Sequence, residues 1–83
     1  MEILENYKLQ IGDDCTIWFE EEKNPYCYAD CRYDGKHNGK WCFTSNTYGW
    51  KFFIDVKTGE VTNSDFTRKM KVNNDTGWMK VLP

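Results

Sequence analysis

Alternation of apolar and polar residues with a period of two is the feature that most constrains the fold of this chain. Trp50, Phe52, Ile54 and Val56 place an apolar side chain at every second position. Because successive side chains of a strand point to opposite faces of a sheet, this run predicts a strand with one buried face. Helical periodicity is nearly absent. The same alternation predicts further strands at residues 7–11, 15–20, 26–33 and 41–47, and short strands near residues 61 and 80.

Turn residues separate these runs and indicate hairpins. The segment DGKHNG (34–39) contains two strong turn dipeptides and predicts a hairpin loop. Residues 57–60 predict a second hairpin, and residues 64–71 are ambiguous because Ser64 suits the cap of a short helix. We therefore expect a mainly β fold, a small antiparallel sheet curled into a sandwich or barrel, with at most one short helix near 64–71.

Length and composition predict one folded domain spanning residues 1–83. The chain is 40% hydrophobic and 17% aromatic, which is typical of a folded domain and not of a disordered chain. Its first ten residues, MEILENYKLQ, lack a basic segment followed by an apolar run, and no stretch has the roughly 20 apolar residues that span a bilayer. These observations predict a cytoplasmic protein with reduced thiols and no membrane partner.

Charge is distributed unevenly along the chain. Residues 1–34 contain nine acidic and three basic residues, whereas residues 35–83 contain eight basic and four acidic ones. The run Glu20-Glu21-Glu22 indicates a negative loop that competes for a basic groove of a partner. A formal net charge of −2 disfavours broad nucleic-acid binding, which normally needs a basic face.

Three cysteines and the single histidine lie close together in the sequence, at Cys27, Cys31, His37 and Cys42. Four such ligands are the number that a structural tetrahedral zinc requires. Their order resembles the zinc knuckle, a family that binds single-stranded nucleic acid and has C-x2-C-x4-H-x4-C spacing. Here the first two gaps are one residue longer, and an extended strand would hold Cys27 and Cys31 roughly 13 Å apart. A zinc site at these residues therefore requires a sharp bend.

Disulfides and a purely structural role are the other two interpretations of the cysteines. With Cys15 included, four cysteines pair in three ways, and adjacent hairpin strands could place Cys31 opposite Cys42 within bridging distance. The segment CRYDGKHNGKWCFTSNTY (31–48) resembles part of the fibronectin type II module, although the final cysteine of that module is missing and the turn is one residue shorter. Free cysteines are also frequent as small core residues. The sequence leaves these three interpretations open.

The aromatic residues provide the candidate binding site. Trp41 to Trp50 carries several large rings around Gly49, more than one face of a sheet can hide. The candidate partner-binding residues are Glu20, Glu21, Glu22, Tyr26, Trp41, Tyr48 and Trp50.

No catalytic arrangement can be assembled from the residue spacing, so we expect no enzyme activity. The sequence predicts a small protein-binding module without a cofactor, monomeric or homodimeric, comparable in type to inhibitors from phages and mobile elements that occlude a host protein. The alternative is a zinc-stabilised nucleic-acid or protein adaptor that uses Cys27, Cys31, His37 and Cys42.

Overall fold

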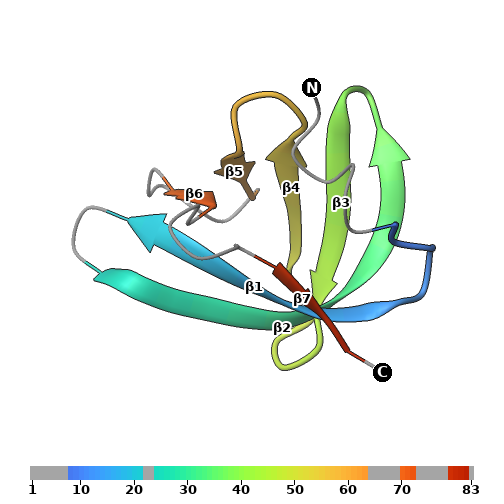
Figure 1. The fold of residues 1–83 in the computed structure, drawn as a ribbon, viewed down its shortest axis with the longest axis horizontal. Helices are drawn as coiled ribbons and strands as arrows, with labels where there is room; N and C mark the ends of the chain where they lie inside the picture. Colours follow the sequence, from blue (N-terminus) through green and yellow to red (C-terminus); the bar gives the residue numbers. More distant parts are fainter. Residues whose placement is uncertain (1–7, 22–23, 64–69, 73–78, 83) are drawn as a thin grey trace.

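The computed structural model describes residues 8–21, 24–63, 70–72 and 79–82, and the regular secondary structure of these residues is entirely β-strand (Figure 1). None of them belongs to a helix that could cross a membrane. The strands are β1 (Asp14–Glu21), β2 (Asn24–His37), β3 (Lys40–Ser45), β4 (Lys51–Asp55), β5 (Glu60–Thr62), β6 (Met70–Val72) and β7 (Met79–Val81).

The first six strands form a closed antiparallel barrel. Each strand from β1 to β6 pairs with the next one in the sequence, and β6 pairs back with β1. β7 is an additional strand that pairs with β1 on the same edge as β6 (Figure 1). The expected small antiparallel β fold is confirmed, and the sheet closes as a barrel.

β1 connects the two ends of the barrel because its edges are shared among three strands. One edge pairs with β2 along nearly its whole length. The opposite edge pairs with β7 at residues 15–17 and with β6 at residues 19–21. The two short strands β6 and β7 therefore share one edge of the long strand β1.

The barrel interior is filled by the alternating apolar side chains. In β3 and β4, buried residues alternate with half-buried or exposed ones, as the period of two predicts. The rings of Tyr33, Phe43 and Phe52 lie together, with centroid distances of 5.3 Å for Tyr33 and Phe43 and 5.4 Å for Phe43 and Phe52. The buried hydrophobic residues are Cys15, Ile17, Phe19, Cys31, Tyr33, Trp41, Phe43, Phe52, Ile54, Val56, Val61, Val72 and Met79.

The hairpin between β2 and β3 turns later than expected. Its turn is Asn38-Gly39, where both residues have positive φ, +52° and +75°. Two positive φ values are what a two-residue type I′ hairpin turn requires. The predicted loop over 34–39 is therefore wrong, because β2 continues to His37. Gly35, with φ +110°, lies where the β2–β3 register shifts, so this glycine accommodates a bulge.

Two further expectations concern the ends of the described segments. A strand over residues 7–11 was predicted, but residues 8–11 form no strand. The Asp13 N–H donates to the Gln10 carbonyl at 3.0 Å and the Gln10 N–H donates to Asp13 Oδ2 at 2.9 Å, which makes a turn. Of the helix proposed near 64–71, residues 64–69 lie outside the described residues, and Met70 and Lys71 belong to strand β6.

Candidate protein-binding surface

The loop between β3 and β4, residues 46–50, is held in one conformation by its own backbone; we call it the aromatic loop. The Ser45 N–H donates to the Trp50 carbonyl at 2.7 Å, and the Gly49 N–H donates to the Ser45 carbonyl at 2.9 Å. The Tyr48 N–H also lies 3.3 Å from the Ser45 hydroxyl oxygen. Gly49 has φ +72°, which glycine adopts without a steric penalty. The loop therefore presents its side chains from an ordered turn.

Two large rings on this loop are stacked and face solvent. The centroids of Tyr48 and Trp50 are 4.8 Å apart, with an angle of 19° between the ring planes. Tyr48 is 70% exposed and Trp50 is 43% exposed. Stacking favours one arrangement of the two side chains, which lowers the conformational entropy that they lose on association.

The aromatic loop is tied to acidic residues of β1 and β2. The Asn46 N–H donates to the Asp30 carbonyl at 2.9 Å, and Asn46 Nδ2 donates to Asp14 Oδ1 at 3.3 Å. Thr16 Oγ1 donates to Asp30 Oδ1 at 2.6 Å, which fixes that carboxylate on the outer face. Both Asp14 and Asp30 are exposed.

A third carboxylate extends this acidic region. Asp34 accepts hydrogen bonds from the Thr44 hydroxyl and from Arg32 Nε, the latter at 3.2 Å. We call Asp14, Asp30 and Asp34 the acidic strip. Three cations lie near the strip in the register: Arg32 is opposite Asp14, Lys80 is opposite Thr16, and Lys51 is opposite Thr44. Carboxylates and cations thus alternate on this face, and the carboxylates of Asp14 and Asp30 are its exposed acidic groups nearest to Asn46 of the aromatic loop.

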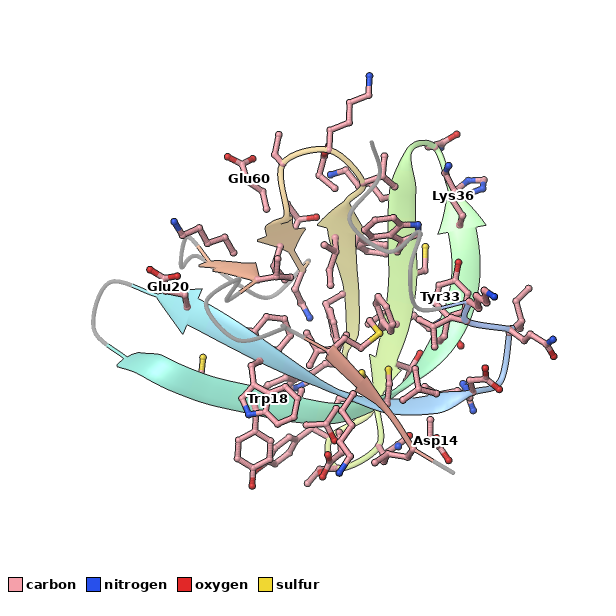
Figure 2. All side chains as sticks on the ribbon, viewed as in Figure 1. Asp14, Trp18, Glu20, Tyr33, Lys36 and Glu60 are labelled. Atoms are coloured by element: carbon pink, nitrogen blue, oxygen red, sulfur yellow. The ribbon has the colours of Figure 1, made fainter. Side chains whose placement is uncertain are left out.

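Two more aromatic residues lie on the outside of the β1–β2 hairpin. Trp18 and Tyr28 are directly opposite each other in the register. Tyr28 is 64% exposed and Trp18 is half-buried, and Figure 2 shows the Trp18 ring on the outer side of the hairpin. Sequence reasoning did not select Tyr28, although the alternation that places Cys27 and Ala29 inward already directs Tyr28 outward.

The structure separates the residues that the sequence proposed as a binding site. Tyr48 and Trp50 are exposed together, as described above. Trp41 is only 3% exposed, so its ring is a core residue and is removed from the candidate anchors. Glu22 lies outside the described residues. The structure describes the backbone of Glu21 and Tyr26 but not their side chains.

Glu20 lies away from the aromatic loop. Its carboxylate oxygen Oε1 is 4.0 Å from Lys71 Nζ on the paired strand β6. Figure 2 shows Glu20 at the opposite end of β1 from Asp14, the residue that contacts the loop. The acidic residues that contact the aromatic loop therefore belong to the acidic strip.

The side chains of the four proposed zinc ligands do not converge on one point. The thiols of Cys27 and Cys42 donate to the carbonyls of Phe19 and Lys40, at 3.8 and 3.9 Å, and His37 is exposed at the end of β2. Cys31 is buried beside Cys15. Within residues 8–21, 24–63, 70–72 and 79–82, no three His, Cys, Asp or Glu side chains gather as a metal site would need.

The expected pairing of Cys31 with Cys42 is wrong. In the register, Cys31 faces Cys15 on one side and Ser45 on the other, whereas Cys42 faces Gly35. None of the four cysteines forms a disulfide in the structure. A hydrogen bond with Cys15, together with burial, raises the pKa of the Cys31 thiol far above its usual range, and burial also raises the pKa of Cys42.

Comparison with known proteins identifies no relative of this chain. No family model matches the chain, and no curated protein and no solved structure matches it. The candidate site therefore rests on the geometry of the aromatic loop and the acidic strip.

Proposed function

We propose that the protein is a small, non-catalytic binding module whose aromatic loop and acidic strip dock on a basic surface of a larger protein. The observation that carries the proposal is the stacked, exposed pair of Tyr48 and Trp50, on a loop whose Asn46 donates to the Asp14 carboxylate and to the Asp30 carbonyl. Tyrosine and tryptophan are enriched among the residues that dominate the energy of protein interfaces.

The chemistry of the surface specifies the kind of partner. Exposed carboxylates attract lysine and arginine side chains and accelerate association with a basic surface. The faces of the Tyr48 and Trp50 rings can also receive a lysine or arginine cation, a contact of about 0.5–1 kcal/mol at an exposed site. A partner with basic residues around an apolar contact therefore complements both features.

Occlusion of the partner surface is the mode of action that we propose, by analogy of type with inhibitors of phages and mobile elements. A domain of 83 residues with a preordered loop needs no chemistry of its own to block a larger protein. The proposal includes action in the cytoplasm, where thiols such as the four found in this chain stay reduced.

The test compares three forms of the full chain in a quantitative affinity purification. The forms are the wild type, the double variant Tyr48→Ala/Trp50→Ala and the control Ile11→Ala. Ile11 is a matched control because it is 75% exposed and its side chain lies over Gly35 of β2 rather than on the aromatic loop. A true partner is enriched by the wild type and by the control, and is lost from the double variant.

Calorimetry with the purified partner then measures the site directly. We expect the double variant to lower the affinity at least about tenfold, and Asp14→Asn/Asp30→Asn to weaken binding mainly at low salt. Equal affinity of the wild type and of Tyr48→Ala/Trp50→Ala would refute the proposed site.

A further inference from the structure

Cys15 and Cys31 are arranged for a covalent bond that the structure does not contain. They lie directly opposite each other on β1 and β2, and their sulfur atoms are 3.6 Å apart. Directly opposed residues of antiparallel strands have Cα atoms about 4.5–5.5 Å apart, within the range of about 4.4–6.8 Å that disulfides span. The backbone is therefore already positioned for a bridge, and only the two sulfur atoms need to approach.

The surroundings hold both side chains in place. Cys15 and Cys31 are completely buried, and the Cys31 thiol also lies 3.7 Å from the carbonyl oxygen of Cys15. The register continues to Val81 beside Cys15 and to Ser45 beside Cys31, so the pair is at the centre of a row across four strands. A bond here would join the middle of the sheet.

The other two cysteines have different surroundings. Cys27 and Cys42 are half-buried, and their thiols donate to backbone carbonyls. The register places Cys27 opposite Phe19 and Cys42 opposite Gly35 and Phe53, so neither has a cysteine as its directly opposed neighbour. Geometry thus selects one of the cysteine pairings.

We propose that Cys15 and Cys31 form an oxidation site, at which a disulfide closes under oxidising conditions and links β1 to β2. With glutathione disulfide as oxidant, one cysteine thiolate attacks a glutathione sulfur and releases one glutathione. The second cysteine thiolate then attacks the protein sulfur of the mixed disulfide and releases the other glutathione. The two cysteines lose two protons and two electrons in total, and one glutathione disulfide becomes two glutathione thiols.

Burial determines when the reaction occurs. Neither sulfur is accessible in the closed barrel, so oxidation proceeds while β1 and β2 are separated, during folding or transient opening. The bridge then closes a loop over a sequence separation of 16 residues. Loop closure of this size lowers the equilibrium constant for unfolding by about a hundredfold. This site is independent of the aromatic loop, so the proposed function and the oxidation site can fail separately.

The experiment refolds the full chain from urea in a glutathione redox buffer, with the wild type and Cys27→Ser/Cys42→Ser compared. Free thiols are alkylated, and intact mass and non-reduced peptide mapping locate the bond. For Cys27→Ser/Cys42→Ser we expect a mass about 2 Da below that of the reduced protein and no alkylation, and for the wild type two alkylated cysteines. Both proteins should give a peptide linking Cys15 to Cys31 and an unchanged circular dichroism spectrum. The oxidised protein should have a higher urea midpoint than the same protein after reduction.

One control variant accompanies the test, and three results would overturn the proposal. Cys15→Ala/Cys27→Ser/Cys42→Ser retains Cys31 alone and should acquire glutathione without losing 2 Da. The proposal is overturned if the Cys27→Ser/Cys42→Ser protein remains fully alkylated after oxidative refolding. It is also overturned if the wild type links Cys31 to Cys42, or if the Cys15–Cys31 bond abolishes the native spectrum.

Discussion

The rings of Phe43 and Phe52 stack across β3 and β4, with centroids 5.4 Å apart and an angle of 15° between their planes. Phe52 also meets Phe19 of β1 edge to face, at a centroid distance of 5.5 Å. Phe52 therefore connects the β3–β4 hairpin to the strand on the other side of the barrel. The next residue, Phe53, faces the outside and is half-buried.

This packing predicts that alanine substitutions at two neighbouring phenylalanines lower the free energy of unfolding by different amounts. Phe52→Ala should lower the free energy of unfolding by about 3–5 kcal/mol, because it leaves a cavity between two rings. Phe53→Ala removes the same atoms from the outer face and should cost about 1 kcal/mol. Urea unfolding followed by Trp fluorescence measures both values. Equal destabilisation by the two variants would contradict the assignment of inward and outward faces.

The backbone conformation of the Asn38-Gly39 turn predicts that a side chain at position 39 lowers the stability through backbone strain. Gly39→Ala places a side chain at φ +75°, although a Cβ there would meet nothing within 4 Å. We expect a loss of about 1–2 kcal/mol from strain alone. Asn38→Gly in the same turn should change stability by less than about 0.5 kcal/mol, because glycine adopts that conformation freely. A neutral Gly39→Ala variant would argue against this turn.

Acidic pH should weaken the β4–β5 turn through Asp55. The backbone N–H groups of Thr58 and Lys57 donate to Asp55 Oδ1, each at 2.9 Å, and lower the pKa of this carboxyl below its ordinary value. A lowered folded-state pKa stabilises the protein above the unfolded value of about 3.9, and this contribution is lost as pH falls through the folded value.

The test of this dependence uses Asp55→Asn, which does not titrate. Urea midpoints of the wild type and the variant should differ more at pH 6 than at pH 2, with the wild type losing its advantage in acid. Other carboxylates titrate in both proteins, so only the difference between the two curves is diagnostic. Parallel curves over the whole range would show that Asp55 does not contribute.

Thiol burial predicts an order of chemical modification in the reduced protein. Cys27 and Cys42 are half-buried, whereas Cys15 and Cys31 are fully buried and the Cys31 pKa is raised by the hydrogen bond with Cys15. Iodoacetamide at neutral pH should therefore modify Cys27 and Cys42 first, and all four only in urea. Peptide mapping against time gives the order. Modification of Cys31 at the rate of Cys42 would be inconsistent with the buried pair.

Much of the barrel could be predicted because alternation reports directly on burial. The inward positions of Cys27, Ala29, Cys31 and Tyr33 followed from the period of two, and all four lie in or against the core. The hairpins were less predictable, since Asp34-Gly35 and Asn38-Gly39 are equally good turn dipeptides in the sequence. The structure uses the second as the turn and the first as a bulge, a choice that depends on register with β3.

The candidate site was only partly predictable for a related reason. Alternation gives the face of a residue within its own strand but not the partner that lies across from it. The neighbouring positions of Cys15 and Cys31 depend on the β1–β2 register. Likewise, Trp41 and Trp50 are both tryptophans near the same hairpin, yet one fills the barrel and the other stacks on Tyr48 beyond the strand end.

The sharing of one β1 edge between β6 and β7 has a consequence for protein synthesis. β1 is completed at Glu21, whereas its partners on that edge are residues 70–72 and 79–81. At roughly 5–20 residues per second, a ribosome needs several seconds to supply them. During that interval the nascent chain can form the β1-to-β5 hairpins in order but cannot close the ring. Barrel closure is thus a late event, and β1 keeps an unpaired edge until then.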